Sequence, residues 1–408
     1  MSEVSPRSDV RPLSNVSEPE VFDVVVVGGG PAGATAATDL ARAGRRVLLL
    51  DKPGRIKPCG GAIPPRLIRD FAIPDSLLVA KIRSARMVSP GDRRVDMPIG
   101  DGFVGMVDRE HFDPWLRNRA VLAGADLRAA TFERIVRDAE GVATVHYRQD
   151  ATARQARARL VIGADGASSP VGRAEIPGHA AMKQVFAYHE IVRVPPEGGG
   201  VEATRCDVYY QGKLSPDFYA WVFPHGDTVS IGTGSARKGF SLRSAIRDLR
   251  ASTGLDAGQT VRREGAPLPL KPLRKWDNGR DVLLTGDAAG LVAPASGEGI
   301  YYAMLGGRLA AEAAEHFLVT GKVSALALAR KKFMRLHGRV FFILRIMQGV
   351  WYRNDPLRER FVSICRDKDV QQLTWDSYMN KELVRAKPVA HLRIFFKDLA
   401  HLFRWVSP

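Results

Sequence analysis

The sequence predicts an α/β fold, in which a Rossmann-like dinucleotide-binding domain contains an inserted antiparallel β-sheet domain and is followed by a helical C-terminal segment. Three glycine-rich segments carry this prediction, at residues 28–33, 163–166 and 286–290. Each follows a short apolar run of the kind that forms a buried strand. One glycine-rich turn is weak evidence, but three in this arrangement indicate one nucleotide site assembled from distant parts of the chain.

The first segment has the GxGxxG spacing, with Gly28, Gly30 and Gly33 after the apolar strand 24–27. Gly28 permits a tight turn, and Gly30 lets the backbone approach a pyrophosphate. Gly33 lets the next helix, predicted over 32–43, lie close to the strand. The spacing therefore predicts a strand, a turn and a helix in the order that binds a dinucleotide.

The start of this helix and the end of the next strand complete the first half of the predicted site. Pro31 and Ala32 begin the helix, whose free N–H groups and partial positive charge attract phosphates. A second strand, predicted over 46–50, leads into Asp51 and Lys52. Asp51 lies 18 positions after the last glycine of the turn (51 − 33), where an acid is expected to accept a hydrogen bond from a ribose hydroxyl.

The second and third glycine-rich segments return the chain to the same fold. A strand at 158–163 leads into Asp165 and Gly166, and a strand at 282–284 leads into Gly286 and Asp287. Together with the GxGxxG turn, they predict one FAD site. We expect five regions: a disordered extension at 1–21, the first part of the FAD-binding domain at 22–180, a β-sheet substrate domain at 181–275, the return of the FAD-binding domain at 276–320 and a basic helical region at 321–408.

The inserted domain reads as short strands separated by turns. We expect strands at 185–192, 206–211, 219–223 and 228–233, with a short helix near 241–253. Consecutive short strands of this kind favour an antiparallel sheet. Before the insertion, residues 108–123 read as a helix.

The composition excludes several classes of protein. Hydrophobic residues make up 45% of the 408 and charged residues 25%, as in an ordinary folded protein, and no run of 18 apolar residues predicts a transmembrane helix. Cys59, Cys206 and Cys365 are far apart, which fits a reducing cytoplasm without structural disulfides. The histidines lack the spacing of metal ligands, so we expect no metal.

The net charge of +16 is concentrated near the C-terminus, where residues 327–366 carry ten Lys or Arg and two acids. Apolar residues recur at helical spacing among Arg335, Arg339 and Arg345, which predicts a basic amphipathic helix. Such a helix either lies on an anionic membrane surface or packs on the core with a solvated basic face. A further amphipathic helix is expected at 392–406. No nucleic-acid motif accompanies the charge, so we expect no nucleic-acid partner.

These motifs resemble those of class A flavoproteins, the superfamily of FAD-dependent hydroxylases and reductases. In that superfamily, the GxGxxG turn binds the ADP part of FAD. The resemblance implies that Asp165 and Gly166 lie near the pyrophosphate and are linked to NAD(P)H use. It implies that Gly286 and Asp287 contact the ribityl and pyrophosphate region.

Within the superfamily, the chain resembles the geranylgeranyl reductases. Three segments carry the resemblance: 57–65 (KPCGGAIPP), 107–113 (VDREHFD) and 219–226 (YAWVFPHG). Residues 55–70 and 102–113 look most like the (bacterio)chlorophyll branch of the family. The resemblance extends from Phe22 to the C-terminus.

The resemblance also assigns expected roles near the flavin ring. The loop of Cys59, Gly60 and Gly61 lies beside the isoalloxazine ring in this family, so Cys59 is expected to position substrate or relay a proton, or only to pack there. Arg109 resembles the family arginine that reaches the FAD phosphates.

A further glycine-containing stretch, 294–300, is expected to begin a helix over 301–314 at the flavin. Its residues Gly297, Gly299 and Ile300 would direct the positive end of that helix toward the reduced ring. The aromatic strand supplies the expected substrate pocket, a long apolar tunnel for a prenyl chain. Its lining residues are Tyr219, Trp221, Phe223 and Pro224.

The expected activity is that of an oxidoreductase acting on CH–CH bonds, which reduces three double bonds of a geranylgeranyl chain to give phytyl. FAD is the expected cofactor and NADPH the expected electron donor, with ferredoxin as the alternative donor. The substrate is geranylgeranyl-bacteriochlorophyll, geranylgeranyl-chlorophyll or geranylgeranyl diphosphate. We expect a cytoplasmic protein with peripheral contact at the photosynthetic inner membrane; the oligomeric state is left open.

Two other functions fit the same scaffold. One is a flavin-dependent monooxygenase, hydroxylase or halogenase, although the segment 219–224 lacks the first Trp of the halogenase pattern Trp-x-Trp-x-Ile-Pro. The other is a flavin-binding assembly protein that carries pigment without turnover.

Overall fold

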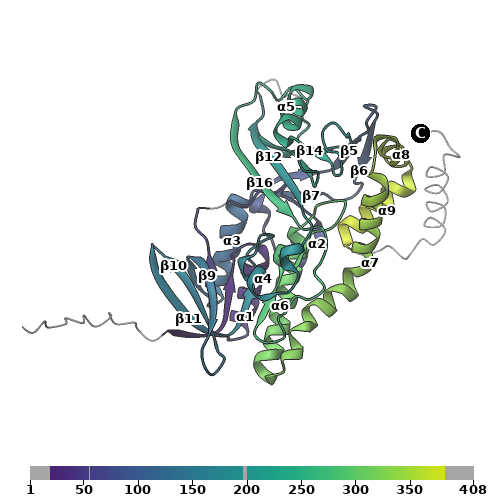
Figure 1. Ribbon diagram of the computed structural model, residues 1–408. Helices are drawn as coiled ribbons and strands as arrows, with labels where there is room; N and C mark the ends of the chain where they lie inside the picture. Colours follow the sequence, from purple (N-terminus) through teal and green to yellow (C-terminus); the bar gives the residue numbers. More distant parts are fainter. Residues whose placement is uncertain (1–18, 55, 196–199, 382–408) are drawn as a thin grey trace, which may run out of the picture.

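The computed structural model describes residues 19–54, 56–195 and 200–381. Two large sheets dominate the arrangement, and a layer of C-terminal helices runs along one side of both (Figure 1). The mixed α/β architecture and the C-terminal helices confirm the predicted fold class. The amphipathic helix predicted at 392–406 and most of the predicted N-terminal extension lie outside the described residues.

The first sheet is the predicted nucleotide-binding sheet. Its strands are β1 (Glu20–Val27), β2 (Val47–Asp51), β8 (Asp126–Ala129), β9 (Thr131–Arg137), β10 (Ala143–Gln149), β11 (Thr152–Gly163) and β17 (Val282–Leu284). The order is β8-β2-β1-β11-β10-β9, and β17 also pairs with β11. Strands β1, β2, β8, β11 and β17 pair in parallel, and the buried runs of Val and Leu in β1, β2 and β17 fit this central position.

The long strand β11 takes part in both antiparallel and parallel pairing. Its first half pairs with β10 in an antiparallel hairpin, and its last residues pair with β17 in parallel. The hairpin of β9 and β10 therefore extends the edge of a sheet whose centre is parallel. The central strand β1 begins at Glu20. Residues 20 and 21 therefore belong to this strand and not to the predicted extension.

Helices α1 (Pro31–Arg42), α3 (Arg109–Leu122) and α6 (Ile300–Thr320) cover this sheet. Glycine lets α1 lie close to its neighbours: a methyl group at Gly33 would lie 1.8 Å from the carbonyl oxygen of Gly28, and one at Gly307 would lie 2.2 Å from the carbonyl oxygen of Ala32. Both distances are impossible for carbon and oxygen, so these two positions require glycine.

The second sheet contains the four strands expected in the insertion and three that were not expected, one at 260–268 and two from residues 84–98. Its strands are β5 (Ser84–Val88), β6 (Arg94–Pro98), β12 (Val185–Arg193), β13 (Arg205–Tyr209), β14 (Ala220–His225), β15 (Thr228–Ser235) and β16 (Thr260–Leu268). The order is β16-β12-β15-β14-β13-β5-β6. All pairs are antiparallel except β13 with β5, because β5 and β6 enter from an earlier part of the chain.

Smaller elements connect the two sheets. A three-stranded sheet contains β3 (Ala62–Ile63), β4 (Leu78–Ile82) and β7 (Val104–Val107). The remaining helices of this part are α2 (Pro65–Asp70), α4 (Pro170–Glu175) and α5 (Leu242–Ser252). Helix α5 packs on β15 and β12 and buries Ile246 and Leu249.

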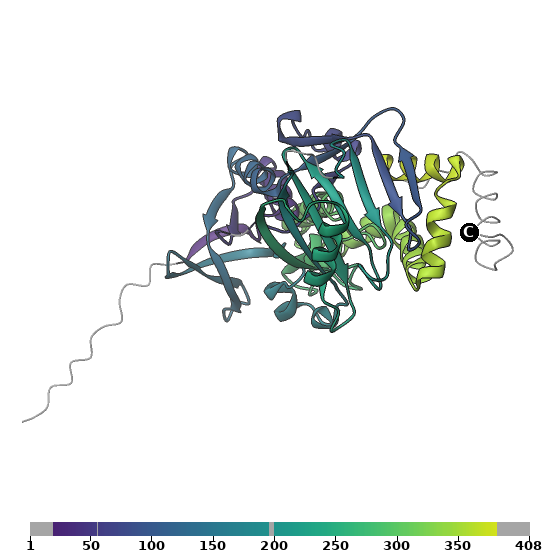
Figure 2. The same cartoon turned by 90° about the horizontal axis from the view of Figure 1, so that it is seen from above.

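The C-terminal layer consists of α7 (Ala327–Trp351), α8 (Asp355–Ile364) and α9 (Lys368–Asn380). Helix α7 packs on α6, and α8 reaches β6 at the far edge of the second sheet, as the view from above shows (Figure 2). This layer therefore holds the two sheets together from one side. Among the described helices, none combines the length and the apolar content needed to cross a membrane.

Arg358 anchors α8, and its side chain is 1% exposed. Its guanidinium donates hydrogen bonds to Asp355 (2.8 Å), to the carbonyl oxygen of Pro216 (2.5 Å) and to that of Tyr352 (2.7 Å). One side chain thus joins the loop before β14 to the turn between α7 and α8.

Replacing Arg358 with Met is expected to destabilise the protein by about 2–4 kcal/mol, since two buried carbonyl groups lose their donor. Urea unfolding followed by fluorescence measures this change. Arg353→Met, at an exposed position of the same turn, is the matched control and should change the unfolding free energy little. Equal stabilities of the two variants would contradict the assigned role of Arg358.

Candidate cofactor and substrate site

The three glycine-rich turns meet at the carboxyl edge of the first sheet. In the parallel register, Val27 is opposite Gly163, and Gly163 is opposite Leu284. Gly28 has φ +102°, and a methyl group there would lie 2.4 Å from the carbonyl oxygen of Ala164. The first turn therefore contacts the second through backbone atoms alone.

The third turn also contacts the first. Gly286 has φ +61°, and a methyl group there would lie 2.7 Å from Cβ of Ala32 at the start of α1. The three segments predicted to form one site are thus brought together by the sheet.

Asp51 lies at the end of β2 and is held by two partners. Its Oδ1 accepts a hydrogen bond from the backbone N–H of Gly29 at 2.8 Å, and its Oδ2 lies 3.0 Å from Nη1 of Arg117. Burial raises the pKa of Asp51, although both partners act against this rise. Each oxygen keeps a lone pair for a ribose hydroxyl. Lys52, next in the chain, is exposed.

The predicted pyrophosphate site has the open space that it requires. The nearest atom to a methyl group at Gly30 would be Nη2 of Arg109, at 3.9 Å. Gly30 is also the N-cap of α1, where no side chain satisfies the first N–H groups, and Pro31 is the first helical residue. A phosphate placed here would meet helix N–H groups and a guanidinium.

Arg109 is a buried cation fixed by Asp113, one helical turn later in α3. Nε and Nη2 of Arg109 donate to the two carboxylate oxygens at 2.6 and 2.7 Å. Burial alone would lower the pKa of Arg109, but Asp113 and the nearby Cys59 raise it above its ordinary value. The guanidinium therefore stays charged between the phosphate space and the loop of Cys59.

Asp165 forms its hydrogen bonds within the second glycine-rich turn and the start of the helix that follows it. Its carboxylate accepts hydrogen bonds from the hydroxyl of Ser169 and the backbone N–H of Val171, at the start of α4. Burial raises the pKa of Asp165 to about 6. Gly166 has φ +85°, and a methyl group there would meet no atom within 4 Å, so its backbone faces open space.

Asp287 of the third turn is paired with Lys57, to which the sequence analysis assigned no role. Nζ of Lys57 lies 2.5 Å from Oδ2 of Asp287, whose side chain is 7% exposed. A methyl group at Gly299 would lie 3.8 Å from Oδ1 of Asp287, so the third turn also reaches the start of α6. Lys57 is the first residue of the segment 57–65, and the resemblance of that segment to the family was the one sign in the sequence that this lysine belongs to the site.

The Cys-Gly-Gly loop, residues 59–61, packs against strand β14. A methyl group at Gly60 would lie 3.2 Å from the ring of Phe223, and Nε2 of His225 lies 3.1 Å from the carbonyl oxygen of Gly60. Burial lowers the pKa of His225, so the imidazole is neutral at pH 7 and its Nε2–H donates to Gly60. Within the loop, the N–H of Gly61 donates to Sγ of Cys59 at 3.3 Å.

The predicted substrate residues form an aromatic wall, Tyr219–Trp221–Phe223, at the start of β14 and just before it. Ring centroids are 6.0 Å apart between Tyr219 and Trp221 and 6.2 Å apart between Trp221 and Phe223. Tyr219 precedes β14 instead of belonging to it, and its hydroxyl donates to the carbonyl oxygen of Ser296 at 2.6 Å. Pro224 is buried within β14.

The start of α6 closes the other end of the site. Gly297 has φ +65°, Gly299 is the N-cap and Ile300 is the first helical residue. No side chain caps this helix start, so its N–H groups are available to an anionic group.

These residues form a continuous cofactor strip along the sheet edge: Asp51, residues 28–32, Arg109, Asp287 and residues 297–300. The strip offers, in order, a ribose acceptor, a phosphate space, a cation and a helix N-terminus, which is the sequence of groups that FAD requires. Bound FAD supplies hydride chemistry that protein side chains lack. Within the described residues, no cluster of His, Cys, Asp or Glu has the form of a metal site.

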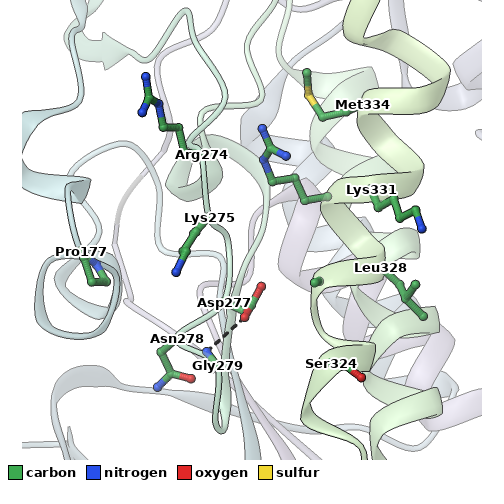
Figure 3. A pocket seen from close by; sticks show the side chains of 12 residues that line it. Pro177, Arg274, Lys275, Asp277, Asn278, Gly279, Ser324, Leu328, Lys331 and Met334 are labelled. Carbon is green, nitrogen blue, oxygen red and sulfur yellow. Dashed lines mark hydrogen bonds between the residues drawn. The ribbon is translucent and has the colours of Figure 1, made fainter.

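A separate surface pocket lies between the loop 274–279 and the first half of α7 (Figure 3). Arg274, Lys275 and Lys331 line it together with Asp277. None of the predicted cofactor or substrate residues belongs to its lining. The pocket is therefore a basic surface feature distinct from the cofactor strip.

Comparisons with known proteins agree with this geometry. The FAD binding domain family matches residues 21–312. The chain is 59% identical to the geranylgeranyl diphosphate reductase of Rhodobacter capsulatus, over 95% of this chain and 99% of that protein. It is 35% identical to the geranylgeranyl diphosphate reductase of Synechocystis, over 94% of this chain and 98% of that protein.

A solved structure has the same fold. The geranylgeranyl bacteriochlorophyll reductase-like protein of Thermoplasma acidophilum superimposes with a TM-score of 0.80 at 23% identity, covering 95% of this chain and 98% of that chain. The family match over residues 21–312 supports FAD as the cofactor of this chain.

Two glycine variants separate cofactor binding from folding. Gly30→Val is expected to fold and to lose FAD, because its side chain enters open space where the pyrophosphate would lie. Gly33→Val is expected to fail to fold, because its Cβ meets the carbonyl oxygen of Gly28. Flavin absorbance and circular dichroism measure the two effects. A Gly30→Val protein that purifies with stoichiometric FAD would contradict the assigned phosphate position.

Proposed function

This chain belongs to the geranylgeranyl reductase family of FAD-binding flavoproteins, and we propose that it reduces three double bonds of a geranylgeranyl chain to give phytyl. The substrate carries that chain either as geranylgeranyl diphosphate or as an ester of bacteriochlorophyll or chlorophyll. NADPH is the proposed electron donor. The reductase relatives support this activity over the monooxygenase alternative.

The observation that carries the proposal is the contact between the aromatic wall and the Cys-Gly-Gly loop. Phe223 packs on Gly60, and Tyr219 is hydrogen-bonded to Ser296, in the turn that leads into α6. A chain lying on the wall would therefore run past the end of the cofactor strip where a flavin ring is expected. Aromatic rings bind an unsaturated hydrocarbon through dispersion and exclude water from it.

An anaerobic assay tests the proposal. Purified protein with FAD and NADPH is mixed with geranylgeranyl diphosphate or with geranylgeranyl-bacteriochlorophyll, and the masses of the products are measured by mass spectrometry. We expect gains of two, four and six hydrogens, with the preferred substrate reduced faster. An oxygen requirement, or addition of oxygen to the product, would contradict the proposal. Reduction by ferredoxin but not by NADPH would overturn the proposed donor alone.

We also propose that the outer face of α7 lies on an anionic membrane. This face exposes four large apolar side chains: Leu336 (55%), Phe342 (54%), Ile343 (41%) and Ile346 (48%). Arg335, Arg339 and Arg345 are exposed among them. The opposite face of α7 is buried against the protein, whereas these four side chains remain exposed among the described residues. Peripheral contact would keep the enzyme near prenylated substrates that partition into the bilayer.

Replacing Arg335, Arg339 and Arg345 with Gln is expected to weaken binding to anionic liposomes roughly 100-fold, from about 1 kcal/mol for each cation. Co-sedimentation with phosphatidylglycerol vesicles measures this. The matched control replaces exposed arginines of other elements, Arg134, Arg154 and Arg247, with Gln. Equal losses in both triple variants would indicate net charge alone, and unchanged binding of the α7 variant would overturn the membrane proposal.

A further inference from the structure

One end of the cofactor strip contains a buried ion pair to which the sequence analysis gave no role. Nζ of Lys381, just after α9, contacts Oε2 of Glu298, in the turn before α6. The two side chains are 3% and 6% exposed. Glu298 stands between Gly297 and Gly299, the two glycines expected at the flavin. Glu298 lies in the stretch 294–300 that the sequence analysis named, but no sequence pattern indicated Lys381, 83 positions later, as its partner.

The surroundings of the pair are aromatic. Nζ of Lys381 lies 3.7 Å from the ring centroid of Tyr378 and 6.0 Å from those of Tyr301 and Tyr302. Tyr378 packs in one apolar cluster with Phe223 of the aromatic wall. The pair is therefore linked to the proposed substrate residues through one apolar cluster.

The ionisable groups around the pair come from several elements. They are Tyr378 on α9, Tyr301 and Tyr302 on α6, Arg66 on α2, Tyr219 before β14 and Cys206 on β13. The Arg66 guanidinium donates to the carbonyl oxygen of Asn380 and so fixes the end of α9. No second acid is found among these neighbours, so within the described residues Glu298 is the only carboxylate that faces Lys381.

We propose that Glu298 and Lys381 together form the proton source for alkene reduction, a role that rests on the proposed function. One carbon of the double bond receives a hydride from the reduced flavin and forms the first C–H bond. The π electron pair then forms the second C–H bond with a proton released by the pair. The hydrocarbon gains two hydrogens and stays neutral, and the pair regains its proton from water.

The chemistry of the neighbouring groups supports this choice. Burial raises the pKa of Tyr219, Tyr302 and Tyr378 above the ordinary value, so these phenols hold their protons more firmly. In the ion pair, burial lowers the pKa of Lys381 and raises that of Glu298, so the lysine releases a proton more readily and the carboxylate accepts one more readily. Both changes favour a neutral pair that shares one proton, and the paired charges limit each shift.

Three variants test the role. Glu298→Gln and Lys381→Met remove one member each, and Lys381→Arg keeps the positive charge but cannot release a proton near neutral pH. Lys81→Met, which breaks the exposed pair of Lys81 with Asp75, is the matched control. FAD content by absorbance and circular dichroism establish that each variant is folded and loaded.

The rate is measured in a single turnover, by mixing pre-reduced enzyme with geranylgeranyl diphosphate without oxygen. We expect a fall of about 100-fold or more in all three variants of the pair, including Lys381→Arg, and no change in Lys81→Met. The wild-type rate should decline as pH rises through a value below the ordinary lysine pKa, and Lys381→Met should lack this decline. Full rescue by Lys381→Arg, or an unchanged pH profile in Lys381→Met, would overturn the proton role and leave a structural pair.

A second readout is independent of turnover. Infrared spectra of the oxidised protein should still contain a protonated carboxyl band at pH values well above the pKa of about 6 of Asp165, and Glu298→Gln should remove it. Absence of this band would overturn the shared proton. If the wild-type protein leaves every geranylgeranyl substrate unreduced, the proposed function fails, and the proton role fails with it because it rests on that function. If the wild-type protein is active and the variants of the pair are slow, the result supports both the proposed function and the proton role.

Discussion

The parallel pairing of β1, β11 and β17 is the constraint on which the rest of the structure depends. This pairing places the ends of three strands, more than 100 residues apart in the chain at each step, at one edge of the sheet. The backbone then turns so closely that Gly28 touches the second turn and Gly286 touches the start of α1. Because the contacts are between backbone atoms and methyl groups, little rearrangement is available when the cofactor binds.

Charge is balanced along the cofactor strip before any ligand is bound. Three ion pairs accomplish this: Lys57 with Asp287, Arg117 with Asp51 and Arg109 with Asp113. A buried charge without a partner is costly, so each cation near the phosphate space is held in place by an acid. The pairing also fixes the direction of each side chain along the strip.

The substrate side depends on a different physical property. The aromatic wall belongs to the second sheet, the Cys-Gly-Gly loop to the connection between the sheets, and Lys381 to the end of the C-terminal layer. They meet near the start of α6, where Lys381 forms a buried ion pair with Glu298. In such surroundings, loss of solvation raises the pKa of a carboxyl group or phenol and lowers that of a lysine.

The sequence by itself determined the class of fold, the three glycine turns and the family, because glycine spacing and apolar strands are local patterns with a local physical meaning. Only the tertiary structure decided which side chains are partners. Arg117 with Asp51, Lys57 with Asp287 and Lys381 with Glu298 are joined across long stretches of chain, and no periodicity relates their positions. The parallel pairing of β5 with β13 was likewise decided by the tertiary structure, because the two strands come from distant parts of the chain.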